Sequence, residues 1–188
     1  MKLVCPIEHF LQAVGTKEID IYNEFSLQHE LGLFLRNYLD GLKVQFERNV
    51  SHFRLRKSEF QKKEIDIAIT STDSTEYLCA IELKYPRNGQ VPEQMFHFCK
   101  DIAFLEQLVS SGFQSAYFLA VADDPLFYSD SRSCEGIYGL FRGRKLIEGT
   151  IRKPTGAKDK KIKIEGHYKA EWFPVSGDTK YCLIQIGD

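Results

Sequence analysis

The sequence carries almost no net charge and has no long apolar run, and both absences narrow its class. It has 188 residues, with 25 Lys and Arg against 26 Asp and Glu, which leaves a formal net charge of −1. Such a chain does not bind nucleic acid through bulk positive charge, so any such contact needs a locally basic surface. The longest apolar run, residues 116–122, is far shorter than the roughly 20 residues that span a bilayer. We therefore expect no contact with a membrane.

The cysteines are odd in number and form no CxxC pair, which argues against a disulfide framework and against a zinc knuckle. There are five of them, and Cys79 and Cys99 stand among apolar neighbours. Reduced, buried thiols in cytosolic proteins have such neighbours. The first residues also lack the uninterrupted apolar segment of a signal peptide. We therefore expect a cytoplasmic protein.

Several common motifs are missing as well. The sequence has no phosphate-binding loop, dinucleotide fingerprint or nucleophile elbow, and we find no repeat, low-complexity tract or linker. What it does have is 43% hydrophobic and 13% aromatic residues, which suits a folded chain with a sizeable core. Because domains usually hold roughly 100–200 residues, we predict one domain over residues 1–188.

Apolar spacing predicts an α/β core over about residues 22–122, preceded by a short helix at 6–14. Apolar residues recur at helical spacing over 22–39 and again over 92–111, and a glycine follows each stretch. Alternating or continuously apolar runs predict four strands, at residues 43–50, 64–70, 77–85 and 115–122. The order is helix, three strands, helix, strand. The second long helix then makes the crossover that a parallel strand pair requires.

The pattern changes beyond residue 123, where glycines, lysines and short apolar runs dominate. The short runs predict strands that pair as hairpins, at residues 136–141, 161–166, 168–173 and 181–186. We therefore expect a C-terminal antiparallel β extension over about residues 123–188, appended to the core.

Three charged residues occupy matching places on two of the predicted strands. Asp66 lies on the second strand, and Glu82 and Lys84 lie on one face of the third because side chains alternate along a strand. Neighbouring strands would bring the carboxylates together, as hard oxygen ligands for Mg²⁺ or Mn²⁺. Lys84 would then steady an attacking water or neutralise charge on the phosphate. Glu30, on the edge of the first long helix, could complete the cluster.

This arrangement resembles the PD-(D/E)xK nuclease superfamily, whose restriction-endonuclease-like core has the same order of helices and strands. The resemblance covers roughly residues 22–122. It implies that Asp66 is the motif's Asp, Glu82 its second acid and Lys84 its Lys, and that Glu30 is the helix-borne acid of many members. Ile65 stands where the motif has Pro, a change that many members share.

The resemblance implies a metal-dependent nuclease that hydrolyses phosphodiester bonds, with DNA as the expected substrate, by attack of a metal-activated water. The ion would be held by Asp66, Glu82 and Leu83. A nuclease-fold protein without catalysis, serving as a nucleic-acid-binding or assembly module, stays open as an alternative. So does an ordinary charged strand face, in which Asp66 pairs with Lys63. The oligomeric state is open too, a homodimer included.

Two segments are locally basic, residues 54–63 and residues 142–163. The second has nine Lys and Arg against two acidic residues, a local charge of +7. We predict that it contacts the phosphate backbone of a nucleic acid through Lys158, Lys160 and Lys161. Gln94 and Lys100, on the second long helix, are further candidates for substrate contact. A solvated hairpin face is the alternative interpretation.

Overall fold

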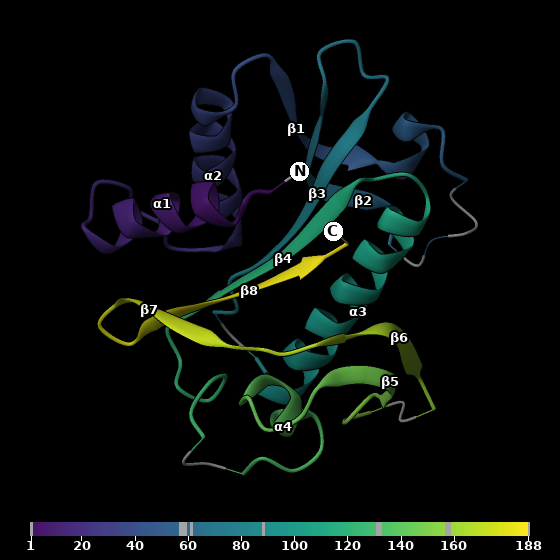
Figure 1. Cartoon of the computed structure of the whole chain (residues 1–188). Coiled ribbons are helices and arrows are strands. Elements are labelled where there is room, and N and C mark those ends of the chain that lie inside the picture. The colour runs from purple at the N-terminus through teal and green to yellow at the C-terminus, as the bar shows by residue number, and fades with distance from the viewer. Residues whose placement is uncertain are drawn as a thin grey trace.

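The computed structural model describes residues 2–56, 60, 62–87, 89–130, 133–156 and 159–187 (Figure 1). Its main feature is a six-stranded sheet with the strand order β1-β2-β3-β4-β8-β7. Among the described strands, β3 and β4 form the one parallel pair of this sheet, and its other neighbours are antiparallel. The strands are β1 (Leu42–Asn49), β2 (Glu64–Ser71), β3 (Tyr77–Lys84), β4 (Ser115–Ala122), β7 (Trp172–Ser176) and β8 (Thr179–Ile186).

The parallel pair depends on a long crossover helix, α3 (Val91–Ser110), which connects β3 to β4. Pro92 opens the helix, where its missing N–H costs no hydrogen bond. Gly112 follows the helix with a φ of +121°, which L side chains rarely adopt, and so allows the chain to turn into β4. The predicted order of helix, three strands, helix and strand is therefore confirmed, as is the crossover.

Helices cover both faces of the sheet. The helices α1 (Val4–Gly15) and α2 (Glu24–Tyr38) lie on one face, and α3 lies on the other (Figure 1). The alternation of β2 and β3 divides their side chains between the two layers: Ile67 and Ile81 pack toward α1 and α2, and Ala68 and Ala80 toward α3. Every residue of β4 is buried, which explains its unbroken apolar sequence.

The C-terminal part differs from the predicted extension in two ways. Residues 136–141 were expected as a strand but hold a short helix, α4 (Ile137–Phe141), since periodicity cannot assign so short an apolar run. The chain over 168–173 is also not one strand, because β6 (Lys161–Tyr168) ends where the expected strand begins and β7 starts at Trp172.

The predicted strand at 181–186 is present as β8, but it pairs with β4 and so continues the core sheet. Only β5 (Ile147–Arg152) and β6 form a separate hairpin among the described residues. A 3₁₀ turn, η1 (Val50–Phe53), follows β1. None of the described helices is long and apolar enough to cross a membrane.

The β5–β6 hairpin is fixed on α3 by a single carboxylate. Glu106 of α3 accepts hydrogen bonds from the backbone N–H groups of Glu165 (3.0 Å) and Gly166 (2.7 Å), and from the Tyr168 hydroxyl (2.9 Å). Burial and this carboxylate raise the pKa of Tyr168, so the phenol stays a donor. Ile162 and Ile164 pack into the core beneath the hairpin. The hairpin is thus a fixed wall beside α3.

We predict that Glu106→Ala lowers the free energy of unfolding by about 2–3 kcal/mol, because it leaves three donors without their charged acceptor. Chemical denaturation monitored by circular dichroism measures this change. The control is Glu165→Ala on the same hairpin, whose partner Lys163 is exposed and 2.8 Å away. An exposed pair of this kind contributes about 0–1 kcal/mol. Equal losses in the two variants would contradict the role assigned to Glu106.

Candidate functional site

The antiparallel register of β2 and β3 brings Asp66 and Glu82 together. Ile67 pairs with Ile81, so the next residue on each strand places the two acids side by side. The backbone N–H of Leu83 donates to Asp66 Oδ2 at 2.8 Å, and the N–H of Asp66 lies 3.4 Å from Glu82 Oε1. Both carboxylates are therefore held by the backbone of the neighbouring strand.

Both acids are withdrawn from water. Glu82 is completely buried and Asp66 is 8% exposed. Burial raises the pKa of Glu82 well above its ordinary value, and the adjacent Asp66 adds to this effect, while Lys62 opposes it. A buried charge without a partner is costly, so this pair needs a cation close by.

Lys62 supplies that cation, and the sequence did not single it out as a site residue. Its Nζ lies 2.9 Å from Asp66 Oδ1, forms an ion pair with Glu82, and lies 4.0 Å from Asp101 Oδ1. Burial disfavours the ammonium, but the carboxylates of Glu82, Asp66 and Asp101 outweigh it and raise the pKa of Lys62. Parity along an extended chain could have found this residue, because Lys62 and Asp66 share a face.

Asp101, on α3, is a second group that the sequence did not single out. It is 6% exposed, and its Oδ2 is 3.3 Å from the Lys84 ammonium but makes no well-formed hydrogen bond with the described residues. Burial raises the pKa of Asp101, with Lys84 and Lys62 opposing the shift. The available signal was a carboxylate within the apolar stripe of a helix, between Phe98 and Ile102.

Lys84 lies on the same side of the sheet as Asp66 and Glu82, as its strand position predicts. Its ammonium contacts Glu24 at 3.0 Å and Asp101 at 3.3 Å, and donates to the carbonyl of Leu83 at 2.7 Å. Burial opposes its charge, but Asp101 and Glu24 raise its pKa. Lys84 is therefore a fixed, fully charged group that three acceptors orient.

The helix carboxylate that reaches the site is Glu24, at the start of α2, where Glu30 was expected. Glu24 bonds to Lys84 and also accepts from the backbone N–H of Tyr85 at 3.3 Å. Gln28, one turn later, donates to the carbonyl of Asp66 at 2.8 Å. Glu30 makes no hydrogen bond or ion pair with any described residue. It lies about 200° around the helix from Gln28, at 3.6 residues per turn, so its place in the cluster is corrected to Glu24.

A pocket of about 300 Å³ opens beside these groups. It is lined by Lys62, Lys84, His97, Lys100 and Asp101. The expected candidate Lys100 is thus at the site, whereas Gln94 lies one turn before His97 on the same side of α3 and is not among the residues that line it. Lys160 and Lys161 line a neighbouring pocket with His97 and Lys100. Lys158 falls outside the described residues.

The donor set suits a hard divalent ion that keeps part of its water shell. Within the described part of the chain, no three His, Cys, Asp or Glu side chains gather as a metal-binding group. Mg²⁺ needs no such group, because one or two carboxylates plus waters and substrate phosphates usually hold it. The ammonium of Lys62 between Asp66 and Glu82 marks a place where the protein already stabilises a cation.

Comparisons with known proteins add no further identification. A scan of protein-family models and searches among curated proteins and solved structures give no match to this chain. Its function is therefore argued from the site itself.

We predict that Lys62→Met lowers the melting temperature in EDTA and enlarges the stabilisation produced by Mn²⁺. The variant leaves Asp66 and Glu82 without their ammonium, and a ligand that binds only the folded state stabilises it in proportion to its affinity. Thermal denaturation with EDTA and with Mn²⁺ measures both effects.

The control for Lys62 is Lys63→Met, which changes the exposed neighbour and should leave both melting temperatures within about 1 °C of wild type, as distant surface changes do. A Lys62→Met variant whose Mn²⁺ stabilisation equals that of wild type would show that the ammonium and the ion do not compete.

Proposed function

We propose that the chain is a Mg²⁺-dependent nuclease with a restriction-endonuclease-like core that hydrolyses phosphodiester bonds, with DNA as its expected substrate. One observation carries this proposal: a fully buried Glu82 is held beside Asp66 with the Lys62 ammonium between them. Interior charge clusters of this kind are costly, and they gather at functional sites.

The arrangement of elements supports the finer assignment of the core. The helix α2, the antiparallel strands β1, β2 and β3, the crossover helix α3 and the parallel strand β4 follow one another in the order that the family resemblance implies. Asp66 and the pair Glu82 and Lys84 lie on the two adjacent strands where the motif residues are expected.

Asp66 and Glu82, with the backbone carbonyl of Leu83, would hold the ion. Carboxylate and carbonyl oxygens are the ligands that Mg²⁺ and Mn²⁺ prefer. When bound, the ion would polarise the scissile phosphate and lower the pKa of a water ligand. The N–H groups of Leu83 and Asp66 orient the two carboxylates through the backbone, so neither acid relies on a mobile side chain for its position.

Lys84 would act on the reacting groups and not on the ion, because an ammonium has donors but no lone pair to offer a metal. It borders the pocket, and Asp101 and Glu24 keep it charged and in place. A fixed positive charge at this point would stabilise the negative charge that develops on the phosphate and would donate to the attacking water.

One observation favours the alternative of a nuclease-fold protein that binds without catalysis. Lys62 already neutralises both proposed metal ligands. A permanent ion pair would fill the place of the metal and leave a structural charge cluster. Mn²⁺ binding by calorimetry separates the two functions, since the alternative requires that no ion binds.

We predict Mg²⁺- and Mn²⁺-dependent cleavage of DNA that EDTA abolishes, tested on linear, circular, single-stranded and branched substrates. Asp66→Asn and Glu82→Gln should lose both cleavage and the heat of Mn²⁺ binding. Lys84→Met should keep Mn²⁺ binding and lose about 10²- to 10³-fold in kcat, the usual effect of removing one group that stabilises developing charge.

The matched control for Lys84→Met is Lys63→Met, an exposed lysine on the strand entry. Wild-type protein that binds Mn²⁺ but cuts none of these substrates would contradict the nuclease proposal. Full activity in Lys84→Met would remove this lysine from the mechanism.

We further predict that Glu24→Gln lowers kcat about two- to tenfold, because Lys84 loses an acceptor that orients it, and that Glu30→Gln has no effect. The two variants remove the same charge from one helix. Steady-state cleavage rates, measured well below the melting temperatures of both variants, test the difference. A reduced rate in Glu30→Gln alone would restore the assignment expected from the sequence.

A further inference from the structure

A second pocket lies between α3 and the β5–β6 hairpin, and it is strongly basic. Its volume is about 370 Å³, and its lining residues come from both walls: Phe96, His97 and Lys100 from α3, and Lys153, Lys160, Lys161 and Ile162 from the hairpin side. No acidic side chain is among the described residues that line it. Basic groups from two elements thus face one cavity.

Most of this charge has no partner within the protein. Lys153 forms an ion pair with Glu93 at 2.6 Å. The ammonium groups of Lys100, Lys160 and Lys161 make no hydrogen bond or ion pair with the described residues. Like charges held close together repel each other, so an anion that entered the pocket would bind favourably.

This pocket is continuous with the pocket at the candidate active site. His97 and Lys100 line both of them, and Lys100 is the neighbour in sequence of Asp101. An anion held by Lys100 and the hairpin lysines would therefore lie beside a phosphate placed at Asp66 and Glu82. A chain of regularly spaced phosphates has the chemistry to occupy both places at once.

The hairpin wall is held in position before any ligand arrives. Glu93 of α3 binds Lys153 and also accepts from the Thr155 hydroxyl near one end of the hairpin. At the other end, Glu106 of α3 holds Gly166 and Tyr168. The lysines of the hairpin need no folding transition to reach α3, so the pocket is preformed.

We propose that this pocket binds a backbone phosphate of the substrate strand next to the one that is hydrolysed. The inference rests on the proposed nuclease function and deepens it: the substrate is a polynucleotide, and a phosphodiester without a neighbouring phosphate is a poor one. The bound chemistry is a phosphodiester backbone, which DNA and RNA share.

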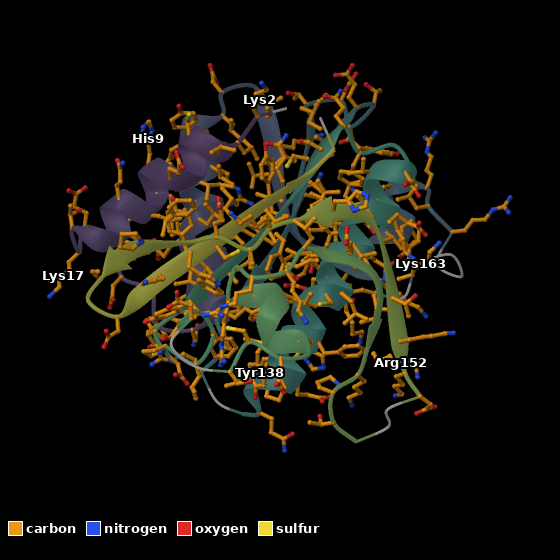
Figure 2. All side chains as sticks on the ribbon, turned by 60° about the horizontal axis from the view of Figure 1, so that its bottom comes forward. Lys2, His9, Lys17, Tyr138, Arg152 and Lys163 are labelled. Carbon is orange, nitrogen blue, oxygen red and sulfur yellow. The ribbon has the colours of Figure 1, made fainter. Side chains whose placement is uncertain are left out.

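The test variant is Lys160→Gln with Lys161→Gln, which removes two charges from the pocket. The matched control is Lys163→Gln with Lys169→Gln, two exposed lysines that do not line it. Figure 2 shows Lys163 and Arg152 at the outer edge of the molecule, on this hairpin, far from Lys17 on the opposite side. Both variants carry the same net charge, so bulk electrostatics affects them equally.

Binding of short fluorescent DNA and RNA oligonucleotides is measured by anisotropy in EDTA, where no hydrolysis occurs. The pocket variant should bind about five- to tenfold more weakly than the control, and its affinity should fall less steeply with salt, by about 0.7 per lost phosphate contact on a single strand. A difference between the DNA and RNA arms identifies the preferred backbone. Lys100→Gln, on the opposite wall, should weaken binding in the same direction.

Hydrolysis of bis(p-nitrophenyl) phosphate, which has one phosphate, is compared with oligonucleotide cleavage. We expect the pocket variant to lose about tenfold more kcat/KM on the oligonucleotide than on the small diester. Pocket and control variants that bind and cleave alike would overturn the proposal, as would wild-type protein that binds no oligonucleotide. Specific weakening of binding in a protein that hydrolyses neither substrate would support the pocket and reject only the nuclease function.

Discussion

Glu82 is a carboxylate with no exposed surface, and the groups around it are arranged to make that burial tolerable. The backbone N–H of Asp66 faces it, the Lys62 ammonium bonds to it, and the completely buried core of β4 lies on the next strand. A charge in such a place is stable only while a cation stays beside it. The fold therefore keeps either an ammonium or a metal ion at this point.

The charged cluster is assembled from distant parts of the chain. Lys62 precedes β2, Lys84 ends β3, Asp101 comes from the middle of α3 and Glu24 begins α2. Acids and lysines alternate in space, so each lysine has at least two carboxylates and remains charged. Loss of one member would leave its partners exposed to like charges, which is why the variants in this cluster should affect several groups at once.

The crossover helix connects the two pockets. One side of α3 packs Phe98 and Ile102 onto the sheet, and a neighbouring side presents His97, Lys100 and Asp101 to the pockets. Its Glu93 and Glu106 fix the hairpin that forms the second wall. One helix therefore sets both the position of Lys84, through Asp101, and the width of the basic pocket.

The sequence by itself determined what local periodicity controls: the helices α2 and α3, the strands of the core, and the shared face of Glu82 and Lys84. Backbone geometry fixes these periods, so they can be read without knowing the fold. Only the tertiary structure decided what long-range packing controls. The rotation of α2 against the sheet selected Glu24 over Glu30, the reach of Lys62 depended on the β2–β3 register, and β8 joined the core because the edge of β4 was free to pair. Each of these is a contact between distant segments, and no spacing along the chain encodes it.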